Sequence, residues 1–202
     1  MEILLNIFRV TIEEGLMYAL LAMGVYSTYS ILDFPDLSVD GTMPMGAVVT
    51  AVLIIAGVNP WLCLLISFVL GMLAGTVTGL LHVKLGIRPL LCGIIVYTAM
   101  LSINLVILFK GNNGITVASF FRKPTIFNSG IAASLPAEWR ITIISLILVV
   151  IFKIAMDFYL ETKSGLLLRA VGDNEKYVTM LARDPGKAKI LGLAIGNGFA
   201  SL

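Results

Sequence analysis

Residues 41–83 contain no Asp, Glu, Lys or Arg, and neither do residues 89–109. A helix needs about 20 consecutive apolar residues to cross the hydrocarbon core of a bilayer. Soluble domains carry charge on about a quarter of their residues, whereas this chain is 13% charged and 58% hydrophobic. The sequence therefore predicts an all-α, polytopic integral membrane protein.

The longer of the two runs is divided by the sequence GVNPW at residues 57–61, because Gly and Pro interrupt helices and Trp favours the membrane interface. This division predicts five complete transmembrane helices and the start of a sixth. The predicted spans cover residues 12–32, 42–56, 61–81, 89–109 and 141–156, and the sixth apolar run starts near Ile190.

The orientation follows from the short loop that holds Lys84 and Arg88, because basic residues in short loops favour the cytoplasmic side. Counting spans from that loop places the N-terminus outside and the charged segment 157–189 in the cytoplasm. Three basic residues in a loop predicted to lie outside count against this orientation: Arg122, Lys123 and Arg140.

Segment 157–189 carries nearly balanced charge and a helical pattern of apolar residues. The predicted apolar face comprises Leu166, Leu167, Ala170, Tyr177, Val178 and Leu181. An amphipathic helix of almost no net charge is a poor ligand for anionic lipid and a better one for a groove on a protein. A plain surface helix at the membrane interface is an alternative of equal weight.

The sequence GLLLRAVGDN at residues 165–174 resembles the cytoplasmic coupling loop of ABC transporter permeases of the branched-chain amino acid and sugar type. The matching positions are Gly165, Arg169, Ala170, Gly172 and Asn174. DFPDLSVDGTMPMGA at residues 33–47 resembles the segment between the first two helices of that family. GIRPLLCGIIVYTAMLSINL at residues 86–105 is similar to its tryptophan/tyrosine, or uncharacterised, permease subgroup. The resemblance covers nearly the whole chain.

This resemblance implies one permease domain, residues 1–202, with a cytoplasmic coupling helix at residues 164–183. The residues implied to couple to a separate ABC ATPase subunit are Gly165, Arg169, Ala170, Gly172, Asn174 and Glu175. An extracellular solute-binding protein or lipoprotein and a homodimeric or heterodimeric permease are also implied, in the bacterial cytoplasmic membrane. Such a complex imports a small polar solute, with an amino acid as the first candidate, by alternating access.

Two features depart from the family pattern. LARDPG at residues 181–186 stands where members have a leucine–glycine step, so the end of the coupling helix is expected to differ. Family members also continue for several more helices, so we expect this chain to be incomplete at its C-terminus.

Acidic residues at a break between two spans are the second candidate site. Asp36 and Asp40 lie beside Pro35 and Gly41, and acidic groups at membrane depth are costly and usually mark a pathway or a polar pairing. We predict that both residues border the substrate path. The alternative is a cytoplasmic loop in which Asp40 caps the next helix.

Polar and small residues inside the spans add two expectations. Asn104 is a further candidate for the substrate path, although such residues more often hydrogen-bond a neighbouring helix. Gly71, Gly75 and Gly79 recur every four residues and allow two helix backbones to approach closely. Packing within the chain is favoured over a homodimer seam.

Several functional classes lack their signatures. The sequence has no phosphate-binding GxxxxGK[ST] loop, no catalytic constellation, no metal-ligand cluster around its single histidine, and no basic patch with aromatic residues for nucleic acid. We expect a non-enzymatic membrane subunit without cofactor, metal or nucleic-acid partner. The alternatives are a secondary transporter or channel driven by an ion gradient, and a scaffold joined through its glycine face.

Overall fold

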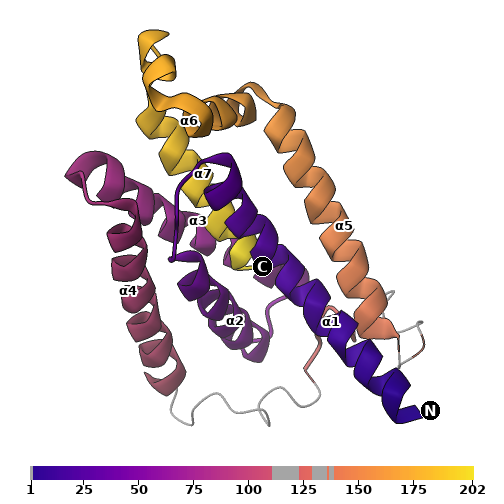
Figure 1. Ribbon diagram of the computed structural model, residues 1–202. Helices are drawn as coiled ribbons and strands as arrows, with labels where there is room; N and C mark the ends of the chain where they lie inside the picture. The colour runs from indigo at the N-terminus through magenta and orange to yellow at the C-terminus, as the bar shows by residue number, and fades with distance from the viewer. Residues whose placement is uncertain (1, 111–122, 129–135, 137–138) are drawn as a thin grey trace.

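The computed structural model describes residues 2–110, 123–128, 136 and 139–202, and every regular element in these ranges is helical (Figure 1). The elements are α1 (Glu2–Val25), the π-helical segment η1 (Tyr26–Ile31), α2 (Val39–Ile55), α3 (Pro60–Leu85), α4 (Pro89–Lys110), α5 (Arg140–Glu161), α6 (Lys163–Met180) and α7 (Pro185–Ala200). The predicted all-α class is confirmed. Each predicted span overlaps one helix, or α1 and η1 together, although the bounds differ by up to ten residues at the start of α1.

The boundaries of α3 show how the sequence sets the helix ends. Asn59 Oδ1 accepts a hydrogen bond from the backbone N–H of Trp61 at 3.0 Å, and Pro60 occupies the first turn, where its missing N–H costs nothing. At the other end, Gly86 adopts a left-handed conformation with φ of 67°. Glycine adopts this conformation without a steric penalty, so it ends the helix.

Three helices of the described chain are long and apolar enough to cross a membrane: Pro60–Leu85, Pro89–Phe109 and Arg140–Glu161. Only 17% to 33% of the residues in their most apolar windows are buried within the chain, so most of their surface is left for lipid or for other subunits. α2 is apolar but shorter, with 17 residues. These helices fit a multi-pass membrane protein, and the count of five complete spans stays a prediction.

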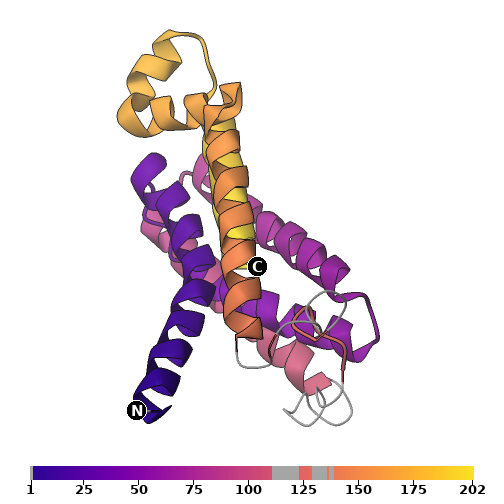
Figure 2. The same ribbon diagram turned by 90° about the vertical axis from the view of Figure 1, so that its right-hand side faces the viewer.

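α7 lies in the middle of the bundle and contacts α1, α2, α3 and α6. α4 packs on α2 and α3 at one side, while α5 packs on α1 at the opposite side (Figure 1). The view turned by 90° shows α6 beyond the bundle, at the end opposite the N-terminus (Figure 2). α6 is therefore the element that projects from the helices predicted to cross the membrane.

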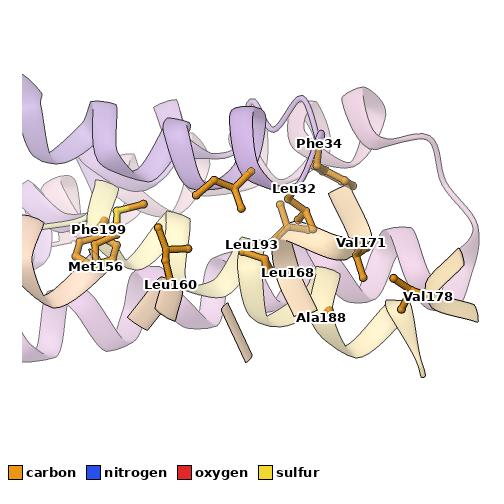
Figure 3. Close-up of a cluster of buried hydrophobic side chains, with 11 residues drawn as sticks. Leu32, Phe34, Met156, Leu160, Leu168, Val171, Val178, Ala188, Leu193 and Phe199 are labelled. Carbon is orange, nitrogen blue, oxygen red and sulfur yellow. The ribbon is translucent and has the colours of Figure 1, made fainter. Parts of the chain in front are cut away.

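The hydrophobic core lies where α6 meets the bundle and follows α7 inward (Figure 3). Its buried members are Ile31, Leu32, Phe34, Met156, Leu160, Leu168, Val171, Val178, Ala188, Leu193 and Phe199. They come from the end of η1 and the residues after it, the end of α5, and both α6 and α7. This core fixes α6 to the rest of the chain.

Candidate functional site

α6 begins with a sharp return from α5. The side chain of Thr162 accepts a hydrogen bond from the backbone N–H of Gly165 at 3.3 Å and so caps the helix. A Cβ atom on Gly165 would collide with the backbone of Leu160. Gly165 thus allows the close turn between α5 and α6, and its immediate contacts are within the chain.

Gly172 also faces the interior of the molecule. A Cβ atom at this position would collide with the carbonyl oxygen of Ile31, the last residue of η1. The family resemblance predicts that Gly172 couples to the ATPase, but its close approach is made to its own chain. Ala170 is likewise packed against the core, whereas Arg169 and Glu175 are exposed.

The coupling segment is not one continuous helix, because Asn174 has non-helical φ and ψ angles of −160° and 92°. Asn174 Oδ1 accepts a hydrogen bond from the backbone N–H of Tyr177 at 3.0 Å. The asparagine therefore acts as an N-cap for a second short helical turn. Sequence periodicity missed this kink, although Asn is a common cap and turn residue.

The kink changes which apolar residues are exposed. Val178 of the predicted apolar face is 2% exposed and joins the core, while Tyr177 and Leu181 are each 59% exposed and Met180 is 82% exposed. Helical spacing extrapolated across residue 174 overlooked Met180, because the helix phase restarts there. Tyr177, Met180 and Leu181 form an exposed apolar surface beyond the kink, which we call the distal surface of α6.

An ion pair holds the distal part of α6 against α7. Lys189 Nζ lies 2.8 Å from Glu175 Oε1, and the lysine side chain is only 15% exposed. Glu175 was expected to contact an ATPase, and in this structure its carboxylate is engaged by its own chain. The pair sets the direction in which the segment after Asn174 leaves the bundle.

Asp36 lies in a buried polar cluster that joins the residues before α2 to α3 and α7. Its carboxylate accepts hydrogen bonds from Ser38 N at 2.8 Å, Ser38 Oγ at 2.6 Å and Asn197 Nδ2 at 2.8 Å. Thr42 Oγ1 lies 3.1 Å from Asn197 Oδ1, and Thr78 Oγ1 donates to Ser38 Oγ at 3.1 Å. Asp36 is 8% exposed, so its oxygens contact protein rather than an open passage.

Asp40 and Asn104 occupy different environments. Asp40 is exposed in the first turn of α2, where its negative charge interacts favourably with the helix dipole. Ser38 occupies the N-cap position without a side-chain hydrogen bond that caps the helix, so Asp40 is not the N-cap residue of α2. Asn104 is 6% exposed on α4, and its Oδ1 atom has no hydrogen-bond partner in the described chain.

A cavity of about 420 Å³ lies between α1, α2, α3, α5 and the end of α7. Its walls are mainly apolar, with Thr50, Thr125, Ser145 and Ser201 as polar members. Asp36, Asp40 and Asn104 are not among its lining residues. The three predicted path residues therefore do not gather around this cavity.

The glycine face of α3 is covered by α7. A Cβ atom on Gly71 would collide with Ser201 Oγ, one on Gly75 with the carbonyl oxygen of Leu193, and one on Gly79 would lie 2.8 Å from Ile190 Cα. The three glycines thus allow two helix backbones of the same chain to pack closely.

Residues 7–202 match the family described as "Branched-chain amino acid transport system / permease component". The chain belongs to this permease family. Members serve as permease components of transport systems, a non-enzymatic role, as the resemblance of residues 165–174 and 33–47 predicted.

Three curated relatives align with nearly all of the chain. The tyrosine transport system permease protein of Clostridioides difficile (strain R20291) is 40% identical over 94% of this chain and 60% of its own length. The uncharacterized protein RP368 of Rickettsia prowazekii (strain Madrid E) is 30% identical over 98% and 66%. The fructose import permease protein FruF of Bifidobacterium longum (strain NCC 2705) is 27% identical over 95% and 52%.

The chain spans about half to two thirds of the length of these relatives. No solved structure matches it.

Proposed function

We propose that the chain is a permease subunit of an ABC importer in the bacterial cytoplasmic membrane. The single observation that supports this most strongly is the family match over residues 7–202. The proposed mechanism is alternating access, in which a separate ATPase drives the helices and an extracellular binding protein delivers the solute. A second permease subunit, identical or different, completes the complex.

The proposed solute is an amino acid with an aromatic side chain. This proposal is supported by the relative that is 40% identical and is named a tyrosine transport system permease protein. A sugar is the second candidate, since a fructose import permease is 27% identical. The higher identity over the same part of the chain favours the amino acid.

The proposed contact with the ATPase is the distal surface of α6. Tyr177, Met180 and Leu181 are large apolar residues, each more than half exposed, on a segment outside the three helices that are long and apolar enough to span. Exposed aromatic and methionine side chains are typical anchors of protein interfaces. Arg169, exposed on the part of α6 before the kink, would lie at the edge of such a contact.

The two rival functions have less support. Transport driven by an ion gradient calls for ionisable residues in the middle of spans, and the second, third and fourth predicted spans, residues 42–56, 61–81 and 89–109, contain no Asp, Glu, Lys or Arg. A scaffold joined through the glycine face of α3 would need a face that α7 already covers.

The experiment reconstitutes the permease in vesicles with the ABC ATPase and solute-binding protein from the same genome. We expect ATP-dependent uptake of radiolabelled L-tyrosine that exceeds uptake of fructose. Uptake that persists without ATP but follows an imposed sodium or proton gradient would favour the secondary transporter.

A pair of matched variants tests the contact surface. The double substitution Met180→Asp and Leu181→Asp is expected to abolish co-purification of the ATPase while membrane insertion is retained. The control is Leu85→Asp, because Leu85 is 66% exposed at the same end of the bundle but lies outside α6. Equal loss of the ATPase in both variants would contradict a specific contact with α6.

A further inference from the structure

Residues 31–38 connect η1 to α2, and they are fixed at both ends by elements far away in the sequence. We call residues 31–38 the connecting segment; residues 33–37 have no regular secondary structure. One end lies under α6, and the other lies between α3, α4 and α7. The segment therefore touches both the element that projects from the bundle and the helices inside it.

The end near α6 has no free space. Gly172 of α6 abuts the carbonyl oxygen of Ile31 so closely that a Cβ atom would collide with it. Leu32 and Leu168 are 3% and 0% exposed, and both side chains lie over Gly192 of α7. A displacement of α6 toward the bundle must therefore move the connecting segment as well, since close-packed interiors transmit strain.

The other end is held by backbone contact and by hydrogen bonds. A Cβ atom on Gly93 of α4 would lie 2.6 Å from the backbone nitrogen of Leu37. Asp36 accepts a hydrogen bond from Asn197 of α7, and Ser38 accepts one from Thr78 of α3. Buried groups hydrogen-bonded in this way are costly to separate.

We infer that the connecting segment transmits movement of α6 to the interior helices, and that Asp36 is the positioning residue that holds the segment on α7 through Asn197. The inference rests on the proposed function, because it assigns a mechanical role within an ATPase-driven permease. It also assigns Asp36 a role other than contact with the solute. Two sites are coupled when one element with contacts at both is biased by each of them.

Swapping the side chains of Asp36 and Asn197 is the sharpest test of their hydrogen bond. Asp36→Asn places an amide NH₂ group opposite the Nδ2 atom of Asn197, so two donors face each other. In the double variant Asp36→Asn/Asn197→Asp, the new asparagine donates to the new carboxylate, and its Oδ1 atom still accepts from Ser38. The double variant therefore keeps every hydrogen bond of Asp36 in reversed or equivalent form. It loses the bond from Asn197 Nδ2 to the carbonyl oxygen of Leu193, and a carboxylate oxygen then faces that carbonyl oxygen.

The first experiment measures backbone hydrogen exchange of the permease alone in lipid nanodiscs. Asp36→Asn is expected to speed hydrogen exchange of amides 165–173 in α6 by about tenfold or more. The double variant Asp36→Asn/Asn197→Asp is expected to slow this hydrogen exchange again. The milder variant Ser38→Ala, which removes one donor to Asp36, should act in the same direction. It serves as the single-site probe if Asp36→Asn does not fold.

The matched control is Ser67→Ala, which removes a buried hydrogen bond between α3 and the carbonyl oxygen of Ser201 just past the end of α7 farthest from α6. This variant should leave exchange in α6 unchanged. The inference is overturned if Ser38→Ala and Ser67→Ala affect hydrogen exchange in α6 equally.

The second experiment measures L-tyrosine imported per ATP hydrolysed by the reconstituted complex. We expect Asp36→Asn to lower this ratio about fivefold or more, with the ATPase still bound. The double variant is expected to recover the ratio. Asp36 would instead belong to the solute path if Asp36→Asn raised the KM for tyrosine, left the ratio of tyrosine to ATP unchanged, and the double variant did not recover the KM. If the wild-type complex imports no tyrosine, the proposed solute is wrong. The hydrogen-exchange measurement on the permease alone still decides the role of Asp36.

Discussion

Lys189 Nζ lies 2.8 Å from Glu175 Oε1, so an ion pair joins the first turns of α7 to the part of α6 beyond its kink. Because Glu175 follows Asn174 directly, the pair acts at the point where the backbone changes direction. The orientation of the distal surface of α6 therefore depends on a contact with α7.

Glu175→Gln is predicted to weaken binding of the ATPase without unfolding the permease. Partly exposed ion pairs contribute about 0.2–1 kcal/mol, so thermal stability should change little. The reversed pair Glu175→Lys/Lys189→Glu should recover ATPase affinity, measured at low and high salt. The control is Lys153→Gln, which disrupts an exposed pair with Asp157 on α5. Equal effects of the two single substitutions would contradict a special role for Glu175.

Gly172→Leu is predicted to destabilise the permease in the absence of any ATPase, because the new side chain collides with Ile31. Overpacking of this kind costs about 1–3 kcal/mol. Thermal unfolding in detergent measures the effect, and Asp173→Leu at the exposed neighbouring position is the control. If Gly172→Leu had normal stability and lost only the ATPase, Gly172 would face the partner after all.

Gly75→Ala is predicted to loosen the packing of α3 on α7, because its Cβ atom would collide with the carbonyl oxygen of Leu193. The same substitution at Gly15 of α1 has open space around it and should be neutral, or stabilising by up to about 1 kcal/mol. Comparison of the two melting temperatures in detergent isolates the effect of close packing. Similar melting temperatures for both variants would contradict the tight α3–α7 contact.

The cytoplasmic position of α6 is predicted to be visible by cysteine labelling. Lys176→Cys, at an exposed site of α6, should react with a membrane-impermeant maleimide in inside-out vesicles and not in intact cells. Trp61→Cys, at the start of α3, should show the opposite pattern. The native Cys63 and Cys92 are 0% exposed and should give little background. Labelling of residue 176 in intact cells would reverse the orientation.

The sequence by itself determined the helical class and the main breaks between the helices. Residues 41–83 have to form helices in a bilayer, because each backbone N–H and C=O there needs a partner within its own segment. Local residues supply the breaks, with Asn59 and Pro60 at the start of α3 and Gly86 at its end. Family membership was also visible in short local motifs such as residues 165–174.

Tertiary structure alone decided the contacts of the candidate site. Asp36 and Asn197 are 161 residues apart in the chain, and only the packing of α7 against the connecting segment brings them to hydrogen-bonding distance. The sequence shows that Gly172 is small, but only the structure shows that it faces inward, against Ile31 at the end of η1. Hydrophobicity and capping act locally and can be read along the sequence, whereas the pairing of distant side chains depends on how whole helices pack.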